Sequence, residues 1–373
     1  MEPDHIMKKV LSTSLLCGLQ ILYFRSLSFF SLLGFAWMRR LWALGFVLAL
    51  IQLVLPVPLG LSDFLGTNIP SLMEYSLHGE FSWWMILLFA GGILFALFSR
   101  KKSRVTLLIC TLLLYPVSLQ MDPFFHVYVL DIGQGDCTII TLPFQQRTIM
   151  IDAAGHLSKD NATQTIIPFL QAKGIRKVDT LIVTHDDLDH AGAVESLMDH
   201  FPVDDLVIPD NVAKKEDPFL HYLLPVREAA DENDRSIITY FSHDGFSWLF
   251  TGDASSQVEL QLLDNYSLQA DVLKLGHHGS STSSDPRFLK AVNPAIGIVS
   301  AGYQNRYHHP SLETLISSDS QGINVLDTPG MGSLHFFSLK NHLFIRTARG
   351  YVSHYARPSS TEEHQPPLVS GLE

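Results

Sequence analysis

The chain has 373 residues, enough for about two domains of roughly 150 residues each. Its formal net charge of -11 argues against a broad, passive nucleic-acid-binding surface, which would draw on lysine and arginine. Only Cys137 of the three cysteines lies beyond residue 120, so an intradomain disulfide is excluded there.

Residues 1–120 are dominated by leucine, phenylalanine, isoleucine, valine and tryptophan, which predicts a membrane-embedded helical region similar to part of a permease. The runs at 41–61 and 81–98 approach the ~20 apolar residues that a helix needs to cross a bilayer. The run at 105–119 is short for a span, and a buried core helix is the alternative. Two further apolar runs within 10–38 favour additional membrane helices, whose number stays open.

Basic residues predict the orientation of these helices, because short loops rich in lysine and arginine stay in the cytoplasm. Arg39 and Arg40 place the start of the 41–61 helix inside, and the basic cluster at 100–104 marks a return to the cytoplasm. If 105–119 crosses once more, the rest of the chain lies outside the cytoplasm. The expected location is therefore the cell (inner) membrane, multi-pass, with the following domain outside. This orientation reverses if 105–119 does not span.

From residue 121 the pattern becomes that of a soluble α/β domain, which we place at 121–356. Apolar residues at helical spacing predict helices within 163–175 and 191–201. The polar, proline-rich segment at 357–373 is expected to be disordered. Alternation and continuous apolar runs predict strands within 126–142, 147–152, 178–184, 235–241, 246–250, 271–276 and 294–300.

The stretch "HDDLDH" begins where the buried strand at 178–184 should end, and it holds two imidazoles and three carboxylates. Carboxylates this close repel one another unless a cation neutralises them or water surrounds them. A solvated acidic loop is therefore the plain alternative. However, His185, Asp187 and Asp189 alternate, so an extended backbone would turn all three to one side, next to His190.

Other strand ends supply matching side chains: Asp253 in "FTGD" and His277 or His278 in "LGHHGS". Together with the 185–190 stretch they predict a site for two metal ions. Imidazole and carboxylate ligands without cysteine favour zinc, manganese or iron over a structural zinc finger. Two such ions activate a water for attack on a phosphodiester or ester, which predicts a hydrolase.

The stretch "LIVTHDDLDHAGA" resembles the metallo-β-lactamase motif H-x-[H/D/E]-x-D-H after a buried strand. With "VLDIGQGDCTII", "MIDAAG", "LFTGD", "DVLKLGHHGSSTSS" and "NRYHHPS" in this order, the sequence is similar to the extracytoplasmic hydrolase domain of ComEC-type competence proteins. These are polytopic membrane proteins implicated in bringing DNA across the inner membrane. The resemblance covers roughly 125–350. It implies an αββα metallo-β-lactamase sandwich, preceded by transmembrane α-helices, with a dinuclear site at one edge.

The resemblance also implies roles for the metal ligands. His185 and Asp187 would bind the first ion, while Asp189 and His190 would bind the second. Asp253 would bridge the two ions. Asp189 would additionally orient the attacking water and so act as a catalytic residue.

A second group of residues is expected around these ligands. The resemblance favours His277 as the remaining ligand and leaves His278 to contact substrate. Ser280 and Asn305 are expected to bind substrate as well. His309 would protonate a leaving group or hold a phosphate, although a plain loop histidine is the alternative.

Three further aspartates are expected to shape or support the site. Asp131 and Asp136 in "DIGQGD" are expected to shape their loop, and Asp152 is expected to support a ligand. The superfamily's usual second histidine is Asp187 here, and its usual histidine before the TGD turn is absent, with "DENDRS" in that stretch. A first site so poor in imidazole favours manganese over zinc or partial filling.

The functional hypothesis is a membrane-anchored metal-dependent nuclease of natural transformation, with two divalent ions (Mn or Zn). Its expected partners are single-stranded DNA as the substrate, the membrane and other proteins of the DNA-uptake machinery. The alternatives are hydrolysis of a small phosphodiester, lactone or thioester, and a non-catalytic DNA-transport subunit.

Overall fold

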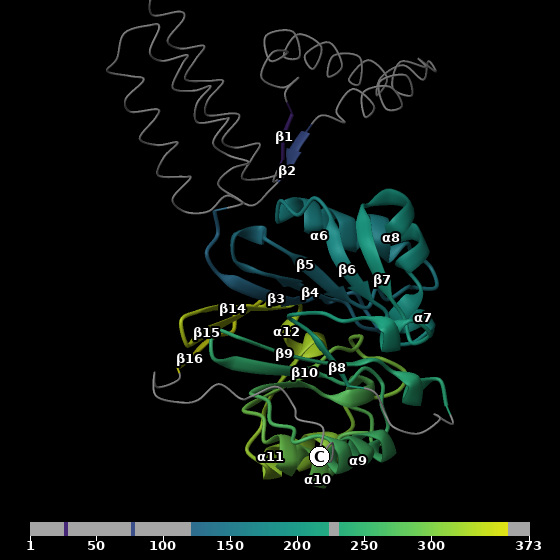
Figure 1. Cartoon of the computed structure of the whole chain (residues 1–373), viewed down its shortest axis with the longest axis vertical. Coiled ribbons are helices and arrows are strands. Elements are labelled where there is room, and N and C mark those ends of the chain that lie inside the picture. The colour runs from purple at the N-terminus through teal and green to yellow at the C-terminus, as the bar shows by residue number, and fades with distance from the viewer. Residues whose placement is uncertain (1–25, 29–75, 79–120, 224–230, 357–373) are drawn as a thin grey trace, which may run out of the picture. The chain divides into compact units, whose positions relative to one another are not determined.

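A computed structural model of the chain describes residues 26–28, 76–78, 121–223 and 231–356 (Figure 1). The apolar runs expected to span a membrane at 41–61, 81–98 and 105–119, and the tail expected to be disordered, lie outside these residues. Within the described ranges, no helix has the length and apolar character needed to cross a bilayer.

The prediction of helices within residues 10–38 is wrong for the three residues that the structure describes there. The apolar runs within 10–38 were expected to be helical, yet β1 (Ser26–Ser28) is a strand. It pairs antiparallel with β2 (Ser76–His78), with Leu27 opposite Leu77. The backbone groups of this short segment therefore bond to another part of the chain rather than along a helix.

The chain divides into two compact units, the first made of Met1–Met121 with Gln171–Gly174 and the second of the remaining residues. The second unit contains two sheets. The larger has the strand order β16-β15-β14-β3-β4-β5-β6-β7. Its strands are β3 (Phe125–Val129), β4 (Thr138–Thr141), β5 (Thr148–Ile151), β6 (Val178–Ile182), β7 (Val203–Val207), β14 (Leu334–Leu339), β15 (His342–Thr347) and β16 (Val352–Ala356).

The smaller sheet has the order β13-β12-β11-β10-β9-β8. Strands β9 and β10, which match the strands predicted within 235–241 and 246–250, form an antiparallel hairpin around "SHDG", and β10 to β13 run parallel. The strands are β8 (His221–Leu223), β9 (Ile238–His243), β10 (Phe246–Phe250), β11 (Val272–Lys274), β12 (Ile296–Val299) and β13 (Asn324–Asp327).

Helices cover the outer faces of both sheets (Figure 1). A π-helical turn (Ala162–Ile166) continues into α6 (Ile167–Ala172), where the sequence predicts a helix, and that segment closes at Gly174 with a positive φ of 73°. The other helices are α7 (Leu188–Ala191), α8 (Val194–His200), α9 (Ser256–Asn265), α10 (Pro286–Val292), α11 (Leu312–Ser320) and α12 (Thr328–Met331). Short 3₁₀ turns lie at Pro143–Gln145, Val212–Lys214, Asn233–Arg235 and Gly276–Gly279.

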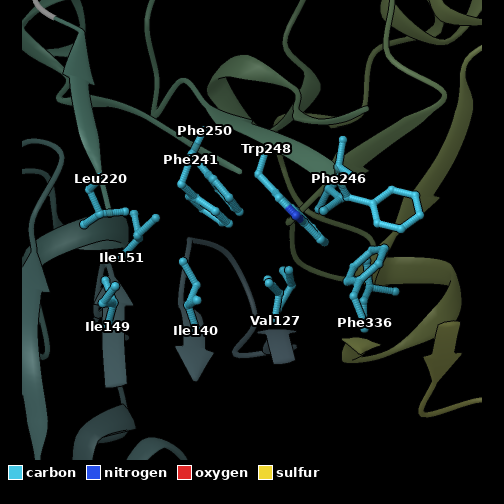
Figure 2. Packing of buried hydrophobic residues seen from close by; sticks show 14 of the residues in the cluster. Val127, Ile140, Ile149, Ile151, Leu220, Phe241, Phe246, Trp248, Phe250 and Phe336 are labelled. Carbon is cyan, nitrogen blue, oxygen red and sulfur yellow. The ribbon is translucent and has the colours of Figure 1, made fainter. Parts of the chain in front are cut away.

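Three hydrophobic clusters separate the layers. Between the sheets, the rings of Phe241, Trp248 and Phe250 face Val127 and Ile140 of the larger sheet (Figure 2). A second cluster joins the larger sheet to α6 and α8, and a third joins the smaller sheet to α9 and α10. The resulting layers are helix, sheet, sheet, helix, so the predicted α/β class is confirmed.

This arrangement gathers strand ends at one edge. Strands β5 and β6 are parallel neighbours in the larger sheet, and β10 and β11 are parallel neighbours in the smaller sheet. The carboxyl ends of parallel strands meet at the same edge, where α/β proteins place their functional loops. The acidic and histidine residues found in the sequence follow these four strands.

Candidate metal centre

The loop after β6 does not stay extended. Asp187 has an extended conformation with φ of -67° and ψ of 151°, and its carbonyl accepts the N–H groups of His190 and Ala191 at 2.9 and 2.7 Å. The chain therefore turns into α7, from which Asp189 and His190 project. The expectation that three residues alternate along one extended strand is wrong, although their side chains still gather.

Four buried side chains form the centre of the site: Asp136, His190, Asp253 and His278, each with one potential ligand atom within 4.8 Å of the others. The Nε2 atom of His190 lies 3.2 Å from Asp253 Oδ1. The Nε2 atom of His278 lies 3.5 Å from Asp253 Oδ2. Asp253 is thus the carboxylate that both imidazoles face. We call these four residues the ligand cluster.

The opposite nitrogen of each imidazole is occupied. His190 Nδ1 lies 2.8 Å from Asp152 Oδ2, and His278 Nδ1 lies 2.8 Å from the carbonyl oxygen of Ser300. A carbonyl oxygen accepts but does not donate, so His278 carries its proton on Nδ1. Its Nε2 lone pair then points into the cluster, as a metal-binding imidazole requires.

Among the described residues, several buried atoms of the site have no hydrogen-bond partner. They are the Nε2 atoms of His185, His190 and His278 and one oxygen each of Asp136 and Asp253. Burying such groups unpaired is unfavourable by several kcal/mol unless a ligand satisfies them. The side chains therefore fit a divalent cation, which would bond to these lone pairs.

Charge within the cluster is strongly coupled. Although burial opposes its charged form, the Asp253 and Asp152 carboxylates raise the pKa of His190 well above its usual value. Burial likewise opposes charge on His278, yet Asp253 and Asp136 raise its pKa to about 9. The pKa of Asp253 is held well below its ordinary value by His190 and His278, despite burial. The buried carboxylates therefore stabilise positive charge within the ligand cluster.

A second group lies beside the cluster. The His185 and His190 rings have centroids 4.1 Å apart, and His185 Nε2 lies 3.6 Å from Asp187 Oδ2. Asp189 Oδ2 lies 3.3 Å from His278 Nε2 on the other side. His185 and Asp187 therefore lie next to each other, and Asp189 lies next to His278.

The structure reverses the preference between His277 and His278. Both have positive φ angles, 46° and 54°, within the Gly276–Gly279 turn, so the chain bends sharply there. His278 turns inward and its side chain is 1% exposed, whereas His277 is 29% exposed with Nε2 3.6 Å from Asp253 Oδ2. We therefore assign the ligand position to His278 and place His277 at the rim.

Asp136 was expected to shape its loop, and it also contacts Lys274 and His278. Its Oδ2 atom forms a 2.8 Å ion pair with the ammonium group of Lys274, and its Oδ1 atom lies 3.3 Å from His278 Nδ1. Asp136 therefore contacts Lys274 and the Nδ1 side of His278 in addition to offering a potential ligand atom to the cluster. The sequence analysis missed Lys274, a charged residue within the apolar stretch "DVLKLG".

Close backbone packing brings Asp136 into place. The Asp136 N–H donates to the carbonyl oxygen of Asp189 at 2.9 Å. A Cβ atom on the preceding Gly135 would lie 2.3 Å from that same oxygen, so only glycine fits in "GQGD". Asp131 is exposed, and its N–H donates to Ser333 Oγ, which agrees with a loop-shaping role.

Asp152 lies where the expected supporting role requires. One of its oxygens contacts His190 Nδ1, and Oδ1 accepts the Thr184 N–H at 2.7 Å. Ser236, from the "DENDRS" stretch, was missed by sequence reasoning. Its Oγ accepts the Asp253 N–H at 3.0 Å and lies 3.4 Å from His185 Nδ1. No sequence signal distinguishes it from other serines.

Ser280 and Asn305, the other residues expected to bind substrate, both form hydrogen bonds within the protein. Ser280 is buried, and its hydroxyl lies 3.0 Å from Thr282 Oγ1. The Asn305 amide donates to the carbonyl oxygens of Gly302 and His309 and accepts the His309 N–H. Both side chains therefore hold their loops in place, and their contact with substrate stays a prediction.

His309 lies at the rim. Its ring centroid is 5.8 Å from that of His277 and 6.4 Å from that of His278. Its Nδ1 atom is buried and has no hydrogen-bond partner in the described part of the chain. Burial and the neighbouring His278 lower the pKa of His309. Its predicted role, to protonate a leaving group or to hold a phosphate, stays a prediction.

Comparison with known proteins agrees with this geometry. Residues 130–246 match the family described as the metallo-beta-lactamase superfamily. The second unit is thus a mixed α/β domain of the metallo-β-lactamase class, and its buried Asp and His cluster fits divalent metal binding.

Three relatives define the family more closely. The chain is 31% identical to ComE operon protein 3 of Bacillus subtilis (strain 168), over 68% of this chain and 39% of that protein. It is 32% identical to competence protein ComA of Neisseria gonorrhoeae, over 56% of this chain and 32% of that protein. It is 30% identical to recombination protein 2 of Haemophilus influenzae, over 69% of this chain and 35% of that protein. The chain is a ComEC-type protein, and its matches span 39% or less of these relatives.

Proposed function

We propose that this chain is a membrane-anchored, metal-dependent nuclease that hydrolyses phosphodiesters of incoming DNA during natural transformation. The observation that supports it most is the set of unpaired buried lone pairs on His190, His278 and Asp253. The similarity to competence proteins supports DNA as the substrate class. The membrane anchor and a domain outside the cytoplasm remain part of the proposal.

In this proposal His185 and Asp187 would hold one cation, while Asp189, His190 and His278 would hold a second. Asp253, which faces both His190 and His278, would complete the ligand set. Bound divalent ions would neutralise phosphate charge and lower the pKa of an attacking water. The low imidazole content around Asp187 favours manganese over zinc.

The protein's own residues have distinct tasks. Asp189 is 32% exposed, so its carboxylate is accessible to orient a water, and it points toward His278. Asp152 and the Ser300 carbonyl fix the two buried imidazoles by their Nδ1 atoms. His309 would bind a phosphate oxygen from the rim.

The test is cleavage of single- and double-stranded DNA by the whole purified chain with Mn²⁺ or Zn²⁺. Asp189→Asn should lose activity, whereas Asp186→Asn, an exposed aspartate of the same loop, should retain it. Equal activity of the two variants would contradict the mechanism. Hydrolysis of a small phosphodiester, lactone or thioester without DNA cleavage would favour the alternative enzyme. DNA binding without any hydrolysis would favour a non-catalytic transport subunit.

A further inference from the structure

Two tyrosine side chains are exposed to solvent on the loop at residues 302–310, which follows β12. Tyr303 is 68% exposed and Tyr307 is 48% exposed. Elsewhere in the described residues, the exposed aromatic side chains are Phe144 and Tyr351, at 51% and 38%. Packing does not account for a tyrosine as exposed as Tyr303, and exposed rings beside a catalytic site are typical of nucleotide-binding surfaces.

The loop is held against the metal centre. The Gly302 N–H donates to Gln134 Oε1 at 3.2 Å, which ties the loop to the "DIGQGD" segment. At its other end the His309 ring lies 5.8 Å from His277. Tyr307 stacks on His309 with centroids 5.7 Å apart and an interplanar angle of 13°. The exposed rings therefore belong to the rim of the ligand cluster.

An arginine accompanies each ring. The Arg306 guanidinium carbon lies 4.6 Å from the Tyr307 centroid, and that of Arg349 lies 6.0 Å from the Tyr303 centroid. Arg349 is anchored by donating to the carbonyl oxygens of Pro329 and Gly330 at 3.0 and 2.9 Å. Tyr307 thus contacts both Arg306 and His309, while Tyr303 has the larger exposed fraction.

The sequence around these residues has no acidic side chain. Neither 286–312 nor 328–360 contains aspartate or glutamate, although the chain as a whole carries a formal net charge of -11. In the part of the chain that the structure describes, Arg306 and Arg349 form no ion pair with a carboxylate. This rim therefore favours an anionic ligand that also offers a planar ring.

Given the nuclease function proposed above, we propose that the loop at 302–310 is a nucleotide subsite in which Tyr303 stacks on an unpaired base of single-stranded DNA. Arg306 and Arg349 bind the phosphates that flank this base. Duplex DNA does not fit this role, because its bases already stack within the helix. A small phosphodiester without a base would leave Tyr303 in water.

The test compares two fluorescent strands by anisotropy: a short oligothymidylate and an abasic strand of equal length. The full chain carries Asp189→Asn to prevent cleavage. Tyr303→Leu should weaken binding of the oligothymidylate at least about fivefold, the loss expected for one stacked base. The abasic strand cannot stack, so its affinity should be the same with and without Tyr303→Leu.

Two further variants complete the experiment. Tyr303→Trp keeps a stacking surface and should restore binding. Phe144→Leu removes an exposed ring at the far end of β4 and should change neither affinity. The proposal is overturned if Tyr303→Leu binds the oligothymidylate like its parent, or weakens both strands equally. DNA cleavage by the chain with Asp189 intact would then leave the nuclease function standing. Absence of both binding and cleavage would remove the two together.

Discussion

The ligand cluster and the loop at 302–310 lie side by side and are built in opposite ways. His190 and His278 are almost fully buried, and each is fixed through Nδ1 by Asp152 or by the Ser300 carbonyl. Tyr303 is exposed, and it belongs to a loop that Asn305 holds together. The contrast teaches that the fold itself orients the buried imidazoles, whereas it leaves the ring of Tyr303 on the surface.

The strongest test of this contrast removes a carboxylate from the ligand cluster. Asp253→Asn keeps the shape of the side chain but removes the charge that both imidazoles face. We expect DNA cleavage to fall on the order of a thousandfold, since metal-borne charge stabilisation is lost. Steady-state rates with Mn²⁺ measure the effect, with Asp186→Asn as the matched control. Cleavage within threefold of the parent would mean that the cluster is not the catalytic site.

Lys274→Met tests the support behind the cluster. It leaves the Asp136 carboxylate buried without its cation, and breaking such a pair costs about 3–5 kcal/mol. Urea unfolding should therefore show a loss of that order. Lys290→Met, at an exposed position on α10, should leave the unfolding free energy within about 0.5 kcal/mol. Equal stability of the two variants would show that the ion pair is not structural.

Asp152→Asn changes a residue that orients His190, and it leaves the proposed ligands themselves unchanged. Loss of such a partner typically lowers metal affinity about 10- to 100-fold. Calorimetric titration of the full chain with Mn²⁺ should show this increase in dissociation constant, while Asp131→Asn binds normally. An unchanged constant for Asp152→Asn would mean that the imidazole is held without the carboxylate.

Glu259 lies outside the ligand cluster and holds the segment that follows the Gly276–Gly279 turn. Its oxygens accept the N–H groups of Ser284 and Asp285, both at 2.8 Å. Burial raises its pKa to about 7, although these N–H groups favour the charged form. A carboxyl with a raised folded-state pKa stabilises the fold at pH values below its unfolded pKa, and that contribution is lost as pH rises through about 7.

From about pH 5.5 to about pH 8, Glu259 should therefore account for a loss of roughly 2 kcal/mol in unfolding free energy. Glu259→Gln cannot ionise, so its stability should fall less over the same interval. Urea unfolding of both proteins at the two pH values measures the difference. Parallel pH dependence of parent and variant would contradict a titrating carboxyl at this position.

Much of the fold could be predicted because buried strands leave a strong local pattern. The run at 178–184 became β6, and the segments around "SHDG" became the β9–β10 hairpin. The helical turn at Leu188–Ala191 could not be predicted, because one turn of helix has no periodicity to read. The sequence therefore predicted an extended backbone at Asp189, which lies in that helical turn.

The site was less predictable where it depends on distant partners. Asp136 and Lys274 are far apart in sequence, and only the packing of the two sheets brings them to 2.8 Å. The choice between His277 and His278 depends on two positive φ angles in one turn, which the sequence "GHHG" does not specify. The types of ligand residue could therefore be predicted from the sequence, whereas the residues that orient them could not.

The most direct test of the ligand cluster is calorimetric titration of Mn²⁺ into the full chain and its His277→Ala and His278→Ala variants. The cluster predicts that His278→Ala loses the tightest binding event, whereas His277→Ala retains it. Loss in His277→Ala alone, or no Mn²⁺ or Zn²⁺ binding by the parent chain, would contradict the assignment of this buried cluster as a metal centre.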